Sequence, residues 1–371
     1  MKTKFNYFLI IGLVFTIFFL EPNLINGSIS QINDNLVSFE KIGQIDTPGM
    51  ARHLVIRDNI AFVTDMGSMT STYGGLFIYN VSDPTAPTEL GHFYDGGRSH
   101  ELLVEDNIAY VADNTGGLEI INITVLTNPV KIGEFNGVIN GVKKRNELLY
   151  LSDYYDGLII ANVSNLTHPV DIARYPQIYH PLLRLIVNDF AYIAVETGLK
   201  VFNISIPTNI SELASYNYDY HVYDLQIAGN VAYMACSRSV YEPGEGLKIL
   251  NCTDPLNMSL IGSFYDGGRA IDLHLYESLV IIGDYNDGLE VINISDPFNP
   301  KEIGHFYDGG NATDIQVVND LIYVADGVDG LEILQIKFPS SNPAKTPALT
   351  FHLMLTYLLV LMCIIKVFKK K

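Results

Sequence analysis

The chain has 371 residues, of which 41 are acidic and 23 are Lys or Arg, so its formal net charge at pH 7 is −18. An acidic surface repels phosphate, which makes nucleic acid an improbable partner. Three cysteines are too few to build a disulfide scaffold.

Residues 1–27 have the layout of a secretory signal peptide. Lys2 and Lys4 precede an apolar run from Phe5 to Leu20, and small polar residues follow. The alternative is an uncleaved membrane helix, although a run of about sixteen apolar residues is short for a span. Either interpretation places residues 28 to 345 outside the cell, beginning with a short lead at 28–38.

Seven copies of Gly-Leu, each followed by an apolar strand, recur along the chain. Their spacings, by subtraction, are 42, 40, 41, 48, 42 and 42 residues. A fixed period of this size, filled with short β segments, is typical of propeller blades of four strands. The longest interval contains an additional loop at 237–245. The copies are Gly75-Leu76, Gly117-Leu118, Gly157-Leu158, Gly198-Leu199, Gly246-Leu247, Gly288-Leu289 and Gly330-Leu331.

One repeat illustrates the predicted blade. Residues 100–104 and 108–112 are strands joined by a tight turn, 118–123 is an almost continuous apolar strand, and 131–135 is a short strand with Gly and charges. The third strand lacks alternation because neighbouring blades cover both of its faces. The fourth suits an outer edge.

The predicted ring closes through its N-terminal strand. The seventh repeat supplies Leu331 to Lys337 as its third strand but reaches Pro339 without a fourth. Phe39 to Ile45 resembles the fourth strands of the other repeats. We therefore expect an all-β, seven-bladed propeller over residues 39–337, in which this N-terminal strand completes the last blade and removes the open edges.

The C-terminal residues read as a membrane anchor. A Pro-containing linker at 338–348 precedes an apolar stretch at 349–365, which is long enough to span a bilayer as a helix. The basic residues of 366–371 then mark a cytoplasmic tail. The two end segments hold six Lys and one Glu, so the domain between them carries 17 basic against 40 acidic residues, or −23.

The repeat resembles a known family. Residues 75–91, 117–133 and 288–304 are similar to the LVIVD repeat of bacterial and archaeal cell-surface proteins. The resemblance implies a surface propeller without an established activity or catalytic residues to transfer. The pattern drifts in the middle, where 199–206 lacks the Asp-Pro of the other repeats and 182–187 lacks their acidic start.

A recurrent Phe-Tyr-Asp-Gly-Gly segment links the outer strand of one blade to the inner strand of the next. Propeller topology places these connections, and the loops between second and third strands, on one face, which we call the upper face. They are either tight turns, with Gly supplying the backbone freedom, or part of a binding face. The predicted ligand contacts on this face are Tyr94, Arg98, His100, His221, Tyr265 and Arg269.

One repeat position at the start of the inner strands carries charged side chains, which could line the mouth of the channel. Loops such as 153–157, 284–288 and 326–330 also place two carboxylates three residues apart before a Gly. Calcium binding is one interpretation of these loops and Asx turns are the other, and we predict neither a cofactor nor a metal site. The channel-mouth residues are His53, Glu101, Asp224, Asp272 and Asp314.

Ten Asn-x-Ser/Thr sequons occur in the domain. Six sit five residues after the repeat Gly, where Asn is equally suited to closing a turn through its side chain. The remaining sequons are the better candidates for glycosylation. They begin at Asn165, Asn209, Asn257 and Asn311.

The sequence lacks the usual hydrolase elbow, zinc-protease, Cys-x-x-Cys and phosphate-loop motifs. The favoured interpretation is a single-pass cell-membrane protein whose external propeller binds an envelope glycan, a peptide or a surface protein. An extracellular hydrolase or lyase with its site at the channel mouth is the alternative, since propellers also host enzymes. A purely structural envelope component is the third.

Overall fold

The computed structural model describes residues 37–67, 74–94, 96–178, 180–196, 198–238, 244–265, 267–285 and 287–338. The predicted signal peptide, the linker beyond Phe338, the membrane anchor and the basic tail lie outside these residues. Within the described part, no helix is long and apolar enough to cross a membrane. The expected secretion and anchoring stay predictions.

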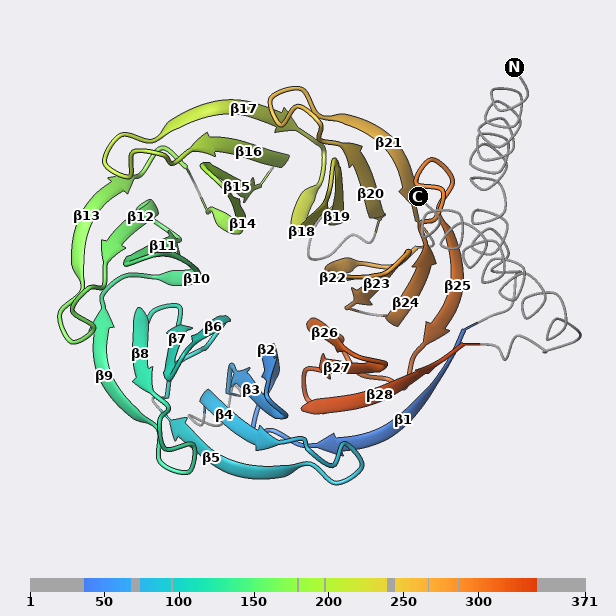
Figure 1. The fold of residues 1–371 in the computed structure, drawn as a ribbon, viewed down its shortest axis with the longest axis horizontal. Helices are drawn as coiled ribbons and strands as arrows, with labels where there is room; N and C mark the ends of the chain where they lie inside the picture. The colour runs from blue at the N-terminus through green and yellow to red at the C-terminus, as the bar shows by residue number, and fades with distance from the viewer. Residues whose placement is uncertain are drawn as a thin grey trace, which may run out of the picture. The chain divides into compact units, whose positions relative to one another are not determined.

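The described residues form seven antiparallel sheets of four strands, arranged in a ring (Figure 1). The predicted seven-bladed propeller is confirmed. Blades 1 to 4, each from the inner strand outward, are β2 (Ala51–Arg57), β3 (Ile60–Asp65), β4 (Gly75–Asn80), β5 (Thr88–Tyr94); β6 (Glu101–Glu105), β7 (Ile108–Ala112), β8 (Leu118–Asn122), β9 (Val130–Phe135); β10 (Ile139–Arg145), β11 (Leu148–Asp153), β12 (Gly157–Asn162), β13 (Val170–Tyr175); and β14 (Leu182–Val187), β15 (Phe190–Val195), β16 (Gly198–Asn203), β17 (Ser211–Asn217). Blades 5 to 7 are β18 (His221–Ala228), β19 (Val231–Ser237), β20 (Glu245–Asn251), β21 (Ser259–Phe264); β22 (Ala270–Tyr276), β23 (Leu279–Asp284), β24 (Gly288–Asn293), β25 (Lys301–Phe306); and β26 (Asp314–Val318), β27 (Leu321–Ala325), β28 (Leu331–Lys337), β1 (Ser38–Ile45).

The hydrophobic core lies between the blades and not within them. Phe77 of blade 1 shares a buried cluster with Tyr323 of blade 7, and Phe62 of blade 1 shares another with Val111 of blade 2. The second and third strands of each blade are buried on both faces, as the continuous apolar repeats predict. A blade therefore depends on its two neighbours for its burial.

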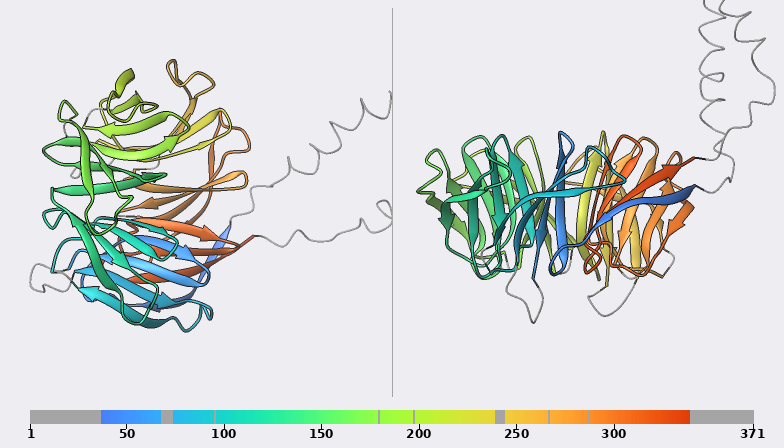
Figure 2. Two further views of the ribbon diagram at one scale, coloured as in Figure 1. Left: turned by 60° about the vertical axis from the view of Figure 1, so that its left-hand side comes forward. Right: turned by 90° about the horizontal axis from the view of Figure 1, so that it is seen from below.

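The ring closes as the sequence predicts. β1 pairs antiparallel with β28, from Ser38 opposite Lys337 to Ile45 opposite Leu331. Val37, just ahead of β1, donates its N–H to the carbonyl of Ile303 in blade 6 at 2.6 Å. The first described residues thus contact the last two blades, and the described ends of the chain meet at one edge of the ring (Figure 2).

The two faces of the ring carry different connections. Each inner strand runs from the upper face to the opposite one, which we call the lower face, so the turns after inner and third strands lie on the lower face. β28 ends and β1 begins there as well, because Lys337 and Ser38 are paired. The chain therefore enters and leaves the propeller on the lower face, away from the Phe-Tyr-Asp-Gly-Gly connections.

The Phe-Tyr-Asp-Gly-Gly connections have a packing role. An aspartate ending a second strand lies buried beneath each of them, and the second Gly of the motif packs against its carboxylate. A Cβ on Gly97 would lie 1.6 Å from an oxygen of Asp113, and one on Gly310 would lie 1.7 Å from an oxygen of Asp326. The glycines are required by this close approach, which supports the interpretation of these segments as turns.

Deletion of β1 tests the closure. A chain beginning at residue 46 loses the β1–β28 ladder and the buried contacts of Phe39, so we expect its free energy of unfolding to fall by about 3 kcal/mol or more in a single cooperative transition. Thermal and urea unfolding, compared with a chain beginning at residue 28, provide the measurement. Equal midpoints for the two chains would show that the strand does not close the ring.

Substitution of a motif glycine tests the turn. Gly310→Ala should destabilise the domain by about 1–3 kcal/mol, because the new methyl group overlaps the Asp326 carboxylate. Gly283→Ala is the matched control, since the nearest atom to a Cβ there is 3.4 Å away. Unfolding in urea measures both variants, and an equal loss in both would contradict the assigned contact.

Candidate functional site

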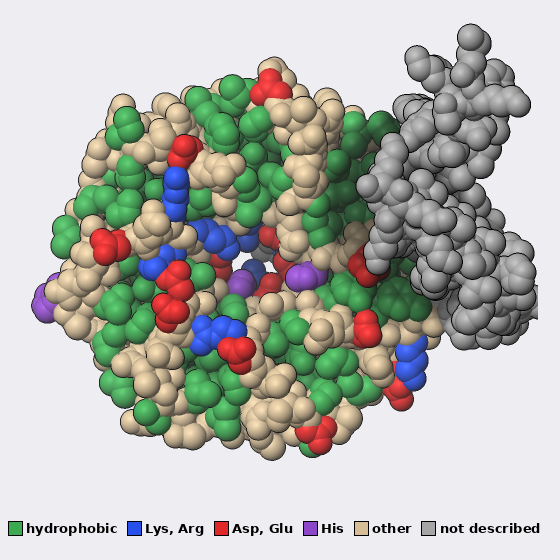
Figure 3. All heavy atoms as spheres, in the orientation of Figure 1, with side chains coloured by type: hydrophobic (Ala, Val, Ile, Leu, Met, Phe, Trp, Pro, Cys, Tyr) green, Lys and Arg blue, Asp and Glu red, His purple; other side chains and the backbone are tan. Residues whose placement is uncertain are grey.

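The inner strands of all seven blades surround a central hollow, visible in Figure 3 with basic, acidic and histidine side chains around it. One residue at the start of each inner strand occupies the same repeat position. The acidic residues and the histidine at this position line the hollow. The seven are His53, Glu101, Gly141, Leu182, Asp224, Asp272 and Asp314.

A β-bulge at the start of the inner strands adds a second lining residue from the same strand. In β2, for example, Ala51 pairs with Asp65 and His53 with Thr64, which leaves Arg52 between them without a partner residue. In blade 2, His100 donates its N–H to the carbonyl of Ala112, the residue opposite Glu101. Because a bulge breaks the alternation of side chains, two consecutive residues of one strand can face the hollow. The residues placed in this way are Arg52, His100, Asn140, Arg184, Tyr223, Ile271 and Thr313.

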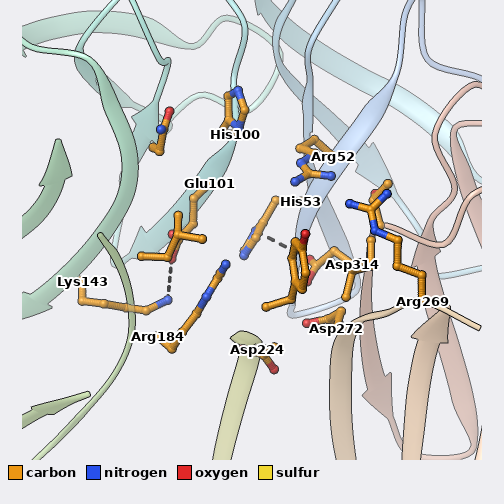
Figure 4. A pocket seen from close by; sticks show the side chains of 15 residues that line it. Arg52, His53, His100, Glu101, Lys143, Arg184, Asp224, Arg269, Asp272 and Asp314 are labelled. Atoms are coloured by element: carbon orange, nitrogen blue, oxygen red, sulfur yellow. Dashed lines mark hydrogen bonds and ion pairs between the residues drawn. The ribbon is translucent and has the colours of Figure 1, made fainter. Parts of the chain in front are cut away.

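These side chains enclose a cavity of about 150 Å³ at the upper end of the channel. Figure 4 shows them converging from all seven blades. Four of the 17 basic residues of the domain lie here, together with four acids and two histidines. The complete lining is Arg52, His53, His100, Glu101, Asn140, Lys143, Leu182, Arg184, Tyr223, Asp224, Arg269, Ile271, Asp272, Thr313 and Asp314. A second space of about 410 Å³, bordered also by Gln226, Ile227, Leu273 and Ile315, continues this cavity downward.

The acidic wall of the cavity connects neighbouring blades. Asp314 accepts the N–H of Leu54 at 2.6 Å, and Asp272 accepts the N–H of Ile315 at 2.7 Å. Burial raises the pKa of Asp272 well above its usual range, and the nearby Asp314 raises it further. Burial also raises the pKa of Asp224. These acids therefore have a structural role and lie in a strongly desolvated wall.

Glu101 differs from the other three acids because it has a cationic partner. Lys143 of β10 donates to its carboxylate. Burial favours the neutral acid, but Lys143, His53 and Arg184 outweigh it and lower the pKa of Glu101. Glu101 is thus an ionised carboxylate that already belongs to an ion pair.

Three arginines join Lys143 in the cationic part of the lining. In Figure 4 the guanidinium groups of Arg52 and Arg269 point toward one another, and that of Arg184 points into the centre. Burial lowers the pKa of Arg52, and the like charges of Arg184 and Arg269 add to this effect. Arg269 lies over the ring of Tyr285 at 4.8 Å and that of Tyr223 at 5.4 Å, which holds it in place.

Two histidines complete the polar lining. His53 Nδ1 lies 3.6 Å from a carboxylate oxygen of Asp314. Burial lowers the pKa of His100 to about 4, and the neighbouring Arg52 and Arg98 contribute to the shift. At neutral pH His100 is therefore an uncharged imidazole that can accept or donate a hydrogen bond.

A groove of about 230 Å³ on the upper face adjoins the central cavity, with which it shares Asn140, Leu182 and Tyr223. Its other walls include Tyr154, His180, Glu196 and His221. The Tyr154 and His180 rings stack at 3.9 Å, and His180 Nδ1 is 2.9 Å from a Glu196 carboxylate oxygen. The groove therefore combines aromatic faces with polar groups directly beside the cavity.

The six predicted ligand contacts do not form one cluster. His100 and Arg269 line the central cavity, and His221 lines the adjoining groove. Tyr94 packs edge-on against Phe77 at 5.4 Å. Arg98 and Tyr265 are exposed and lie outside the lining of either space. The expected channel-mouth residues do come together. Arg52 and Arg184 were not anticipated, because period-two alternation gives no sign of a bulge. Lys143 was not anticipated either, although it lies two residues after Gly141 in the regular part of β10.

The acidic loops have hydrogen-bonding roles that fit Asx turns. Asp153 accepts the N–H groups of Val138, Tyr155 and Asp156, so its oxygens are already engaged by donors. Asp308, Asp326 and Glu332 form an acidic group spaced closely enough for a metal, but Lys41 donates to Asp308 and Glu332. A lysine therefore already supplies positive charge within this group. Calcium binding stays untested.

The six regular sequons follow a turn-forming pattern. Asn80, Asn122, Asn162, Asn203, Asn251 and Asn293 each accept the N–H of the residue two positions on, as the alternative interpretation of these sequons predicts. Asn165 makes the same bond with Thr167. Cys236 and Cys252 are both free and buried.

Known structures share this fold at low sequence identity. The computationally designed Ika8 protein is 9% identical with a TM-score of 0.58, and the match covers 80% of this chain and 99% of that one. Selenomethionine-substituted virginiamycin B lyase from Staphylococcus aureus is 10% identical with a TM-score of 0.61, covering 81% and 99%. A catalytically inactive variant of that lyase with quinupristin gives 10%, 0.60 and the same coverage. These likenesses show the fold alone.

No curated protein sequence matches the chain significantly. The family model of the LVIVD repeat, in contrast, matches residues 48–95, 96–137, 145–176, 185–218, 267–308 and 309–354. Residues 219–266, which the match leaves out, contain the four strands of blade 5. The matched segments cover well over half of the sequence, and the protein therefore belongs to the LVIVD repeat family.

Proposed function

We propose that this protein is a binding module of the cell surface whose ligand enters the central cavity from the upper face. The ligand would be a component of the cell envelope: a glycan, a peptide or a surface protein. The propeller fold and the LVIVD repeats support an interaction module in general terms. The cavity supports the finer assignment of where that interaction takes place.

The observation that carries the proposal is the gathering of Arg52, Arg184 and Arg269 in one small space. Burial and the like charges of Arg184 and Arg269 both disfavour the charged form of Arg52, although acidic side chains border the same cavity. A propeller with Leu182 or Gly141 at the channel position still forms its blade, so the fold itself does not require charge there. Functional sites are where proteins retain such unfavourable groupings.

Orientation supports the same proposal. The described chain ends leave from the lower face, and the predicted linker at 338–348 and membrane anchor at 349–365 follow directly. A linker of about ten residues spans at most about 35 Å, so the lower face would stay near the membrane. The cavity mouth would then face away from the cell, toward its partners.

Catalysis at the same cavity is the second candidate, and one observation favours it. His100 and Glu101 are consecutive residues that both line the cavity, the first neutral and the second ionised. A neutral imidazole beside a carboxylate is suited to general acid–base chemistry. Recovery of the bound ligand after long incubation discriminates the two functions, since a hydrolase or lyase converts it and a binding module returns it intact.

Two arginines at the same repeat position provide a matched pair for locating the site. Arg269 lines the cavity, whereas Arg98 is exposed outside it. In a screen of the full chain against envelope glycans, peptides and surface proteins, with calcium and with chelator, Arg269→Ala should weaken binding about tenfold or more and Arg98→Ala should leave it nearly unchanged. Equal losses in both variants would place the ligand on the outer rim instead.

Cysteine labelling of intact cells tests the orientation. Tyr155→Cys lies on an upper-face loop of blade 3 and Glu147→Cys on a lower-face turn of the same blade, and both positions are exposed. A membrane-impermeant maleimide should label both, and position 155 faster, because the lower face is held toward the bilayer. The buried native thiols at 236 and 252 give a low background. Labelling only after cell lysis would overturn the external location.

A further inference from the structure

We propose that the ligand is a saccharide chain with a carboxylate-bearing sugar at its end. The acidic sugar occupies the central cavity, and the next sugar lies in the groove formed by Tyr154 and His221. This inference rests on the proposed binding function and adds to it the chemical class of the ligand.

The three arginines of the cavity provide binding partners for the carboxylate of the ligand. Arg52, Arg184 and Arg269 all reach the same space. The Nε of Arg184 is buried and has no hydrogen-bond partner among the described residues. A guanidinium presents two parallel donors to a carboxylate, so an acidic group bound here satisfies the free donor and neutralises the repulsion between the three cations.

Acidic side chains beside the arginines provide partners for the hydroxyl groups. Asp224, Asp272 and Asp314 border the same cavity, and carboxyl oxygens accept hydrogen bonds from hydroxyl groups. Inorganic phosphate lacks the several hydroxyl donors of a sugar ring and leaves most of these acceptors unused. A sugar with one carboxylate suits the mixed lining, because its anionic group meets the arginines while its hydroxyl groups donate to the acids.

The volume of the cavity fits one ring. Its size is about 150 Å³, and a protein cavity of that volume can hold a six-membered ring such as benzene. The substituents of a sugar ring need more space, which the adjoining volume of about 410 Å³ below the cavity offers. A longer chain must therefore leave the cavity. The adjoining groove of about 230 Å³, which shares Asn140 and Tyr223 with the cavity, offers room for the following sugar.

The groove has the chemistry expected of a sugar subsite. Tyr154 is 38% exposed, stacks on His180 and meets the Tyr155 ring edge-on at 4.9 Å, so exposed aromatic surface lines the groove for the apolar face of a sugar ring. The Glu196 carboxylate and the Asn140 amide provide polar partners beside the aromatic faces. Aromatic surface with a few fixed polar groups is the usual composition of a small-molecule subsite.

A peptide fits the cavity less well, because the inner strands offer little free backbone. The N–H groups of Leu54 and Ile315 are taken by Asp314 and Asp272, and that of Leu275 is taken by Gln226. An extended peptide gains its affinity by pairing with such groups along a strand edge. Neighbouring blades already occupy them, so recognition must come from side chains.

Calorimetric titration of the purified full chain tests the inference. The probes are galacturonate, glucuronate and N-acetylneuraminate, with galactose and tetraglutamate as the neutral and peptidic comparisons. At least one acidic sugar should bind at least tenfold more tightly than galactose. Arg184→Met should weaken that binding about tenfold or more, whereas Arg145→Met should not, because Arg145 pairs with Asp189 outside the cavity.

The groove is tested with the trisaccharide of the acidic sugar that binds. Tyr154→Ala should remove the added affinity of the trisaccharide and leave monosaccharide binding unchanged, and Tyr307→Ala, an exposed tyrosine outside the groove, should change neither. NMR titration of His100 supplies a readout that a folding defect does not imitate. Its pKa of about 4 should rise when the anion binds beside Arg52.

The outcomes separate this inference from the proposed function. Tighter binding of galactose or tetraglutamate than of every acidic sugar, weakened by Arg184→Met, overturns the acidic saccharide but retains the cavity as a binding site. Acidic-sugar binding that ignores Arg184→Met in a variant with an unchanged melting temperature also overturns it. If none of the probes binds and the envelope screen finds no ligand that depends on Arg269, both proposals fail.

Discussion

Burial between neighbouring blades is the constraint on which the structure depends. Each sheet has two apolar faces, and every core cluster joins residues of adjacent blades, so an incomplete ring would leave one face of two blades exposed to water. The antiparallel pairing of β1 with β28 completes the cycle by joining the two ends of the domain. The ring in turn fixes seven inner strands around a common axis, which no single blade could position.

The bulges at the start of the inner strands convert this symmetric scaffold into a particular cavity. A regular strand would present one residue in two to the channel, and the repeat position alone would give a lining of mostly acidic side chains. The extra residue in β2 and β14 adds an arginine, and the one in β18 adds Tyr223. The bulge changes the pairing at one point of the inner strand and leaves the rest of the blade unchanged. It therefore determines the charge and shape of the site.

Different residues of the cavity have the structural role and the proposed functional role. Asp314 and Asp272 bind backbone groups of the next blade, so their loss would weaken the ring and the site together. Arg184 has a buried Nε with no hydrogen-bond partner among the described residues, although its charge also acts on Glu101 and Asp224 of other blades. Variants of Arg184 therefore report more directly on the ligand than variants of Asp314 and Asp272, which report chiefly on the ring.

Features that recur in the sequence were predictable because repetition makes them visible. The blade count, the closing strand and the turn-forming asparagines all follow from residues that return at fixed spacing, and the structure confirms each of them. The channel position was found in the same way, through His53, Glu101 and the three aspartates. Arg52 and Arg184 were missed because each occurs once and neither position shows a charge pattern in the other blades. A binding site in a repeat protein depends on residues that differ between the repeats. A prediction based on what the repeats share therefore does not find these residues. In this propeller, the residues that depart from the repeat, above all Arg52 and Arg184, are therefore the candidates for determining ligand specificity.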